Sequence, residues 1–140
     1  MALILDTGPL LASMDRRDAH YEVCRRLLSS TREALAIPTA VLTELDYWLG
    51  VYGGPSAQLT FVDDLIARRY AVVDLVPDDY LCIRQIMAQY SDSAVGFVDA
   101  AVLAIVERLN EPKLATLDRR HFGVMRPRHV AALHLLPEMP

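Results

Sequence analysis

Short apolar runs alternate with longer amphipathic segments along the chain, and this alternation constrains the fold more than any other feature. The apolar runs have the length and composition of β-strands and lie at 2–5, 34–37, 71–75, 113–117 and 131–136. Apolar residues at helical spacing fill most of the sequence between them, at 18–30, 39–51, 56–69, 77–89 and 95–109. Because strands that alternate with helices form parallel β-α units, we expect a layered α/β domain with a mainly parallel sheet.

Glycine and proline mark the breaks between these segments. The sequence Asp6-Thr7-Gly8-Pro9 predicts a turn into a helix directly after the first strand. Pro38 closes the second strand, and Thr39 is the expected N-cap of the next helix. That helix should end at Gly53-Gly54-Pro55 and be followed by a second helix, which predicts a helical hairpin.

The length and composition indicate one globular unit. A chain of 140 residues suits a single domain, so we treat 1–140 as one. No apolar run approaches the ~20 residues of a membrane span, and no basic segment precedes the apolar stretch at 2–5, as a signal peptide would require. Cys24 and Cys82 lie in no CxxC motif, so we expect free thiols, a cytoplasmic location and no membrane partner.

The charge is unevenly distributed. The net charge of −4 argues mildly against a nucleic-acid partner, because phosphate binding depends on Lys and Arg. However, the stretch Arg119–His129 (RRHFGVMRPRH) contains arginines and histidines and no acid. The distribution therefore leaves a basic segment as a candidate nucleic-acid contact.

Two aspartates directly follow predicted strands. Asp6 follows the first strand and Asp118 follows the strand at 113–117. In open parallel sheets, ligands bind at the carboxyl ends of strands, where the strand order reverses. If these two strands are neighbours at that point, both carboxylates face one crevice. The alternative is that each is an ordinary helix-cap or turn aspartate.

Asp99 is the only charged residue between Ala94 and Val106. A carboxylate in such an apolar helix is costly to bury unless it pairs with an arginine or binds a cation, and we favour the cation. On the helix at 39–51, Glu44 and Asp46 lie about 100° to either side of Leu45, so periodicity alone does not choose between them.

Asp6, Asp99, Asp118 and one acid of that helix have no histidine or cysteine at ligand spacing among them. An all-carboxylate set favours Mg²⁺ or Mn²⁺ over zinc. Such ions polarise a phosphate, activate a water and stabilise the leaving oxygen, but the four acids alone do not determine the function.

Four segments, in this order and spacing, resemble the PIN-domain family and more closely its VapC-type toxins: LILDTGPLLA at 3–12, PTAVLTELDYWL at 38–49, VGFVDAAVLAI at 95–105 and LATLDRRHF at 114–122. The resemblance implies a three-layer, Rossmann-like fold with strand order 3-2-1-4-5. It also implies a Mg²⁺- or Mn²⁺-dependent endoribonuclease that cleaves structured RNA (tRNA or rRNA) and inhibits translation. A cognate antitoxin and a homodimer are the implied partners.

The resemblance also assigns residues. It places the catalytic acids on Asp6, Glu44, Asp99 and Asp118, with Asp6, Asp99 and Asp118 holding the metal, and it chooses Glu44 over Asp46. The family often has a small hydroxyl residue after the first aspartate and another two positions before the last acid. Thr7 and Thr116 fill those places and are candidate RNA contacts. Arg119, Arg120 and His121 would lie beside the site, where guanidinium groups can bind phosphate oxygens, and are further candidate RNA contacts; the alternative for these three is an ordinary solvated surface. Gly8 departs from the family, whose toxins often carry Ser or Ala there, and Asp92 is a further candidate acid.

Three aromatic residues on the helix at 39–51 are candidates for a groove that binds the antitoxin. Tyr47, Trp48 and Tyr52 belong to the residue types enriched at interfaces, although they could equally be core residues. The resemblance favours partial exposure.

Two other functions remain as alternatives. A receiver or phosphatase domain would use Asp6 as a nucleophile, but it usually has a second acid beside the first and a lysine near a late strand, and Lys113 is the only lysine. A non-catalytic PIN-like module that binds RNA or protein would be expected to have lost some of the four acids.

Overall fold

The computed structural model describes residues 1–139 and contains one five-stranded parallel sheet, in the order β3-β2-β1-β4-β5. The strands are β1 (Ala2–Leu5), β2 (Ala34–Pro38), β3 (Ala71–Val73), β4 (Lys113–Ala115) and β5 (His134–Leu136). The helices are α1 (Thr7–Ser13), α2 (Tyr21–Ser30), α3 (Thr39–Ile66), α4 (Pro77–Gln89), the 3-10 helix η1 (Ser91–Ser93), α5 (Phe97–Arg108) and α6 (Arg119–Val124). The expected α/β class and strand order are therefore confirmed.

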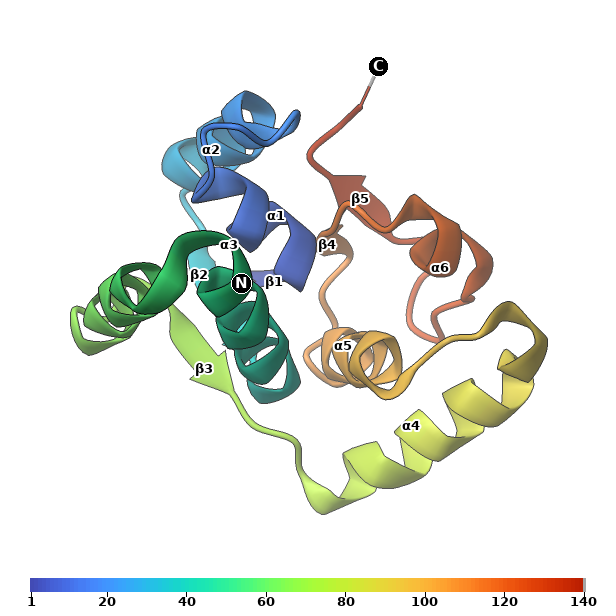
Figure 1. Cartoon of the computed structure of the whole chain (residues 1–140). Coiled ribbons are helices and arrows are strands. Elements are labelled where there is room, and N and C mark those ends of the chain that lie inside the picture. Colours follow the sequence, from blue (N-terminus) through green and yellow to red (C-terminus); the bar gives the residue numbers. More distant parts are fainter. Residues whose placement is uncertain (140) are drawn as a thin grey trace.

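Helices cover both faces of the sheet, as a three-layer fold requires. In Figure 1, α1 and α2 lie on one side of the sheet and α4 and α5 on the other. Helix α5 packs against β2 and α3, whereas α4 packs on α5. The side chains from Ala100 to Val106 on α5 are all buried, which explains why this helix is apolar on every side.

The pairing of β1 with β4 forms the centre of the sheet. Ile4 lies opposite Leu114 and Leu5 opposite Ala115, and Leu3, Ile4 and Leu5 are fully buried. Beyond the last pair, the backbone N–H of Asp6 donates to the carbonyl of Ala115 over 2.9 Å. The ladder therefore places the carboxyl ends of β1 and β4 side by side, where the strand order reverses.

Helix α3 consists of two arms that meet at a kink. Gly54 has φ 69° and ψ −169°, which is not helical, and Pro55 follows it. The two arms run in different directions in Figure 1, as the Gly53-Gly54-Pro55 break predicts. This backbone conformation is essentially restricted to glycine.

The structure differs from expectation at several boundaries. Strands β3, β4 and β5 are shorter than predicted, and α6 and η1 were not predicted at all. The six residues of α6 are too few for an apolar period to be recognised, and this short helix begins at a side-chain cap provided by Asp118. Thr39 is not an N-cap: Pro38 holds that position, and the Thr39 hydroxyl lies 2.5 Å from Asp74 Oδ1.

Both cysteines are free thiols, with Cys24 buried and Cys82 half-buried. Within residues 1–139, no helix combines the length and the apolar character that crossing a membrane requires.

The kink at Gly54 gives a testable prediction. We expect Gly54→Ala to destabilise the fold by about 1–3 kcal/mol, because alanine is strained at a positive φ. Space is not the reason, since a Cβ at Gly54 would meet no atom within 4 Å. Urea unfolding measures the effect. Gly123→Ala is the matched control, because a Cβ there is equally free and its φ is not positive. Equal unfolding midpoints for the two variants would contradict the assignment.

Candidate active site

Four acids from distant segments lie around the carboxyl ends of β1 and β4. Asp6 directly follows β1, Glu44 lies on the first arm of α3, Asp99 is in the first turn of α5, and Asp118 precedes α6. Their charges act on one another, since Asp99 and Glu44 both contribute to raising the pKa of Asp6. The fold therefore brings together the four acids that the sequence singled out.

Asp6 is the most buried of these acids, with 6% of its surface exposed. Thr116 Oγ1 donates a hydrogen bond to Asp6 Oδ2 over 2.7 Å. Loss of water around the carboxylate raises the pKa of Asp6 to about 6, against the effect of this hydrogen bond, and the nearby acids add to the rise. A carboxylate in this position is poorly solvated and is stabilised by any cation that binds beside it.

The structure brings Glu44 to the site and leaves Asp46 outside. Thr7 Oγ1 donates to Glu44 Oε1 over 2.5 Å, and the charge of Glu44 also helps raise the pKa of Asp99. Asp46 is exposed and accepts a hydrogen bond from Gln58 Nε2, on the second arm of α3, at 3.1 Å. The choice that the sequence alone left open thus depends on which flank of α3 faces α1.

Asp99 is half-buried, less enclosed than its apolar surroundings in the sequence predict. It lies in the first turn of α5, where the preceding Phe97 is 44% exposed. Partial burial raises the pKa of Asp99, the charge of Asp118 raises it further, and His121 opposes the rise. Its basic neighbour is therefore a histidine, where the alternative from the sequence was an arginine.

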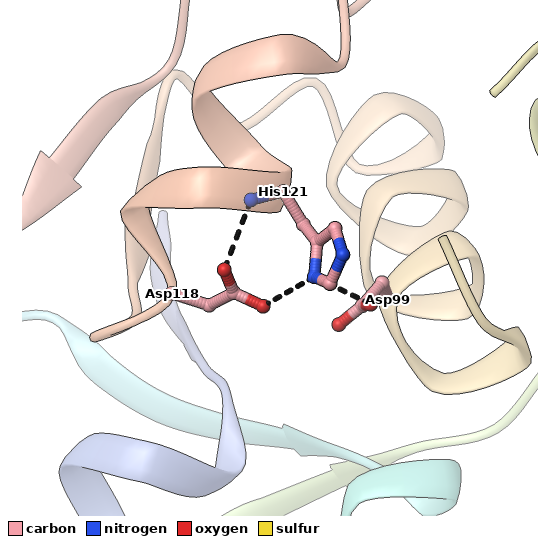
Figure 2. A group of neighbouring side chains, drawn as sticks. All are labelled: Asp99, Asp118 and His121. Atoms are coloured by element: carbon pink, nitrogen blue, oxygen red, sulfur yellow. Dashed lines mark hydrogen bonds and ion pairs between the residues drawn. The ribbon is translucent and has the colours of Figure 1, made fainter. Parts of the chain in front are cut away.

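His121 lies between Asp99 and Asp118, as Figure 2 shows. Its Nδ1 is 2.8 Å from Asp118 Oδ2 and 3.4 Å from Asp99 Oδ2, and the Asp118 carboxylate raises the pKa of His121. The expectation that no histidine stands at ligand spacing is therefore wrong. The overlooked signal is the spacing of three between Asp118 and His121, which places both on one face once α6 forms.

Asp118 also has the helix-cap role that the sequence left open as an alternative. It is the N-cap of α6, and its Oδ1 accepts the backbone N–H of His121 over 2.9 Å. Its own N–H donates to Thr116 Oγ1 over 3.0 Å. The cap fixes the direction of the carboxylate without removing it from the acidic cluster.

The other residues considered as RNA contacts lie in different surroundings. Thr116 is fully buried and Thr7 is 7% exposed, so their hydroxyls orient Asp6 and Glu44 and do not face solvent. Arg119 is exposed, but its guanidinium donates to the carbonyls of Leu135 and Pro137. Arg120 is exposed and lies between Asp118 and His121 in the sequence. The further candidate acid Asp92 is exposed in η1 and is not part of the cluster formed by Asp99, Asp118 and His121.

The three aromatic residues on the first arm of α3 form an exposed stack. Trp48 meets Tyr47 edge to face at 5.0 Å between ring centroids and stacks on Tyr52 at 5.8 Å. The exposed fractions are 62% for Tyr47, 37% for Trp48 and 54% for Tyr52. These side chains are therefore not core residues. Beside Tyr52, a small hollow is lined by residues of α1 and both arms of α3, including Leu11, Met14 and Leu49.

The donor atoms of the cluster fit a divalent cation. One ligand atom each from Asp99, Asp118 and His121 lies within 4.8 Å of the other two. The buried Asp6 carboxylate, whose pKa is raised by desolvation, is a further oxygen donor that a cation would stabilise. Carboxylate oxygens suit Mg²⁺ and Mn²⁺.

The raised pKa of Asp6 predicts how stability depends on pH. Without metal, the folded state holds the Asp6 proton up to about pH 6, whereas the unfolded chain releases it near the ordinary aspartate pKa of 3.8. The unfolded state therefore binds fewer protons across this window, and this group lowers the unfolding free energy as the pH rises from about 4 to 6. Asp6→Asn removes that destabilisation.

We therefore expect Asp6→Asn to be more stable than the unsubstituted protein at pH 7.5, by about 3 kcal/mol at most. The difference should shrink toward pH 4.5. Urea unfolding in the presence of a chelator measures it at both pH values. Asp46→Asn is the control, because it makes the same substitution at an exposed carboxylate outside the site. A pH-independent difference for Asp6→Asn would show that burial does not act on this carboxylate as described.

Comparison with known proteins agrees with this arrangement. No family model matches the chain. Ribonuclease VapC26 of Mycobacterium tuberculosis is 29% identical over 125 residues, which cover 89% of this chain and 93% of that protein.

Solved structures share the fold. VapC20 of Mycobacterium tuberculosis, described as a sarcin-ricin loop cleaving toxin, superposes with a TM-score of 0.74 at 19% identity, over 80% of this chain and 86% of its own. A chain of VapBC2 from Rickettsia felis, solved with a promoter DNA fragment, superposes with a TM-score of 0.71 at 17% identity. The match covers 98% of this chain and 100% of that chain. A chain of DNA-bound VapBC from Salmonella typhimurium superposes with a TM-score of 0.68 at 21% identity. The match covers 96% of this chain and 98% of that chain.

Several independent observations thus agree. The four sequence segments occur in the order of the family, the strand order is the one that the resemblance implies, and the four acids meet at the carboxyl ends of β1 and β4. Ribonuclease VapC26 of Mycobacterium tuberculosis aligns over 89% of this chain. The chain is thus similar in sequence, over most of its length, to a VapC-type ribonuclease, and it shares the fold of solved VapC structures.

Proposed function

We propose that this protein is a divalent-metal-dependent endoribonuclease that cleaves structured RNA, such as tRNA or rRNA, and acts as the toxin of a VapBC-like pair by inhibiting translation. The observation that carries the proposal is the convergence of Asp6, Glu44, Asp99 and Asp118 from four separate segments. This clustering is electrostatically unfavourable by itself. It is consistent with a site that has to bind a cation.

Asp6, Asp99 and Asp118 would hold the cation, directly or through its waters. A bound Mg²⁺ or Mn²⁺ supplies Lewis-acid activation of the scissile phosphate and of the attacking water. Thr116 holds Asp6 in place through its 2.7 Å hydrogen bond. Glu44, held by Thr7, orients the water for in-line attack, since its other carboxylate oxygen has no side-chain partner among the described residues.

The surface around the cluster offers groups for RNA. Arg120, two residues after Asp118, is exposed and can contact a phosphate through its guanidinium. Arg119 already uses part of its guanidinium on the carbonyls of Leu135 and Pro137, so fewer of its donors are free for a phosphate. A hollow at the carboxyl ends of β2 and β3 is lined by Thr39, Tyr80 and Phe97. The rings of Tyr80 and Phe97 can stack on an unpaired base.

The alternatives account for fewer observations. A receiver or phosphatase would need a lysine near Asp6, but Lys113 pairs with Glu33 at the start of β4, away from the carboxyl edge. A non-catalytic PIN-like module would not need the four acids. RNA binding without cleavage would favour that module.

The enzymatic proposal is tested with purified protein freed of any partner. We expect cleavage of structured RNA that requires Mg²⁺ or Mn²⁺ and stops in excess EDTA. Asp6→Asn and Asp99→Asn should each lower the rate by about 100-fold or more, because each removes a negative ligand while keeping its shape. The matched control is Asp46→Asn, whose carboxylate lies outside the site. Undiminished cleavage in EDTA, or equal losses in all three variants, would refute the metal mechanism.

We further propose that the aromatic stack of Tyr47, Trp48 and Tyr52 is part of the groove that binds the antitoxin, and that the protein forms a homodimer in the cytoplasm. The exposure of all three rings and the hollow beside Tyr52 support an apolar partner there. The free thiols are consistent with a reducing compartment.

We expect Trp48→Ala to weaken binding of the antitoxin, taken as the product of the neighbouring gene, by about tenfold or more. Binding of Mn²⁺ should not change, because no metal ligand is removed. Calorimetric titration measures both affinities. Leu81→Ala is the control, because Leu81 is an apolar side chain on α4 that is 64% exposed. Antitoxin affinity that is unchanged in Trp48→Ala, or lowered as much in Leu81→Ala, would place the groove elsewhere.

A further inference from the structure

We propose that His121 is a nitrogen ligand of the cation in this site, through Nδ1, and that it shifts the site's preference away from Mg²⁺ toward first-row transition ions such as Mn²⁺. The inference rests on one part of the proposed function, namely that the acidic cluster binds a divalent cation. It changes the ligand set from oxygen alone to oxygen and nitrogen.

The distances around Nδ1 suit a shared cation. Nδ1 lies 2.8 Å from Asp118 Oδ2 and 3.4 Å from Asp99 Oδ2. Two adjacent ligands of an octahedral ion, each about 2.1–2.2 Å from it, lie about 3 Å apart. The three donor atoms therefore need little movement to bind the same ion, and Figure 2 shows them converging from α5 and α6.

The other ring nitrogen fixes the orientation of the imidazole. Nε2 of His121 lies 3.1 Å from the carbonyl oxygen of Ser93, which can only accept a hydrogen bond. Nε2 therefore carries a hydrogen, and Nδ1 is the nitrogen that faces the two carboxylates. Histidines that bind metals commonly donate their second N–H to a backbone carbonyl in this way.

Nδ1 cannot face these carboxylates with a bare lone pair, because carboxylate oxygens are also acceptors. Either a proton or a cation must lie between them. The acidic surroundings would stabilise both, but a divalent ion satisfies all three donors, whereas a proton on Nδ1 is shared by two carboxylates at unequal distances. The three donor atoms therefore lie close enough together for one cation to bind all of them.

The residue that carries the ring is held by the same network that holds the acids. Asp118 accepts the backbone N–H of His121 through Oδ1 and contacts the ring Nδ1 through Oδ2, Thr116 accepts the N–H of Asp118, and the hydroxyl of Thr116 donates to Asp6. The imidazole is thus connected, through Asp118 and Thr116, to the most buried carboxylate. A side chain that only contacted RNA would not need this attachment.

A nitrogen ligand has consequences for the choice of metal. Mg²⁺ is a hard ion that takes oxygen ligands and gives up its waters reluctantly. Imidazole suits first-row transition ions, so replacing one oxygen or water by Nδ1 favours those ions relative to Mg²⁺. Mn²⁺ also accepts the carboxylates of this site and is therefore the probe of choice.

The test uses metal-free, full-length protein loaded with Mn²⁺ alone. Electron spin echo spectroscopy should show the ¹⁴N modulation of a directly bound imidazole. The modulation should disappear in His121→Asn and persist in His134→Asn, since His134 lies at the start of β5 and pairs with Glu138. Incorporation of ¹⁵N-histidine should replace the ¹⁴N signal in the unsubstituted protein.

Competition between the two ions provides a second readout. We expect the ratio of Mg²⁺ to Mn²⁺ dissociation constants to fall by about tenfold in His121→Asp, the change expected when one ligand's chemistry is altered. This variant restores an all-oxygen set and keeps a side chain that can bind the ion. Circular dichroism checks that His121→Asn and His121→Asp are folded.

The outcomes distinguish the proposal that His121 is a metal ligand from the proposal that the protein is a metal-dependent nuclease. Mn²⁺ that binds without ¹⁴N modulation, and whose binding is lost in Asp99→Asn, would overturn the role of His121 and leave the metal-dependent nuclease standing. No binding of Mn²⁺ to the unsubstituted protein would overturn both. Modulation that persists in His121→Asn would also refute the assignment, because the nitrogen would belong to another residue.

Discussion

The parallel pairing of β1 with β4 brings together residues that are 110 positions apart in the chain, Asp6 and Thr116. The Asp6 N–H continues the ladder onto Ala115, so the aspartate leaves β1 directly beside the residue whose hydroxyl holds it. Asp118, the cap of α6, follows two residues later. Most of the site depends on this pairing, because α3 and α5 add Glu44 and Asp99 to a pair of strand ends that already lie next to each other.

The cluster concentrates negative charge where water is largely excluded. Burial raises the pKa of Asp6, and burial and the charge of Asp118 raise that of Asp99. The surrounding core offsets this destabilisation: the helix that carries Asp99 continues into a fully buried apolar stretch, Ala100–Val106. Such a local conflict between stability and charge is typical of a site maintained for function. His121 is the only basic side chain described within 4 Å of Asp99 or Asp118 among residues 1–139.

Much of the fold and of the acid set could be predicted from the sequence. The apolar runs gave the strands, and Asp99 was recognisable as the single charge in a long apolar segment. The strand order and the choice of Glu44 required the resemblance, because helical spacing treats the two flanks of Leu45 alike. The structure separates them through contacts between segments, since Thr7 reaches Glu44 and Gln58 reaches Asp46.

Other features depend on tertiary contacts that no local pattern records. His121 was interpreted as an RNA contact because it follows two arginines, whereas the short helix α6 turns its ring toward α5. Thr116 likewise appears in the sequence as a small polar residue near an acid, and only the neighbouring strand makes its hydroxyl a donor to Asp6.

The central claim is that acids from four segments form one cation site at the carboxyl ends of β1 and β4. A crystal structure of the protein soaked with Mn²⁺, with data collected at the manganese absorption edge, tests it most directly. The account predicts one dominant anomalous peak within ligand distance of Asp99 and Asp118 and beside Asp6. Manganese bound only elsewhere on the surface, with these carboxylates turned apart, would contradict it.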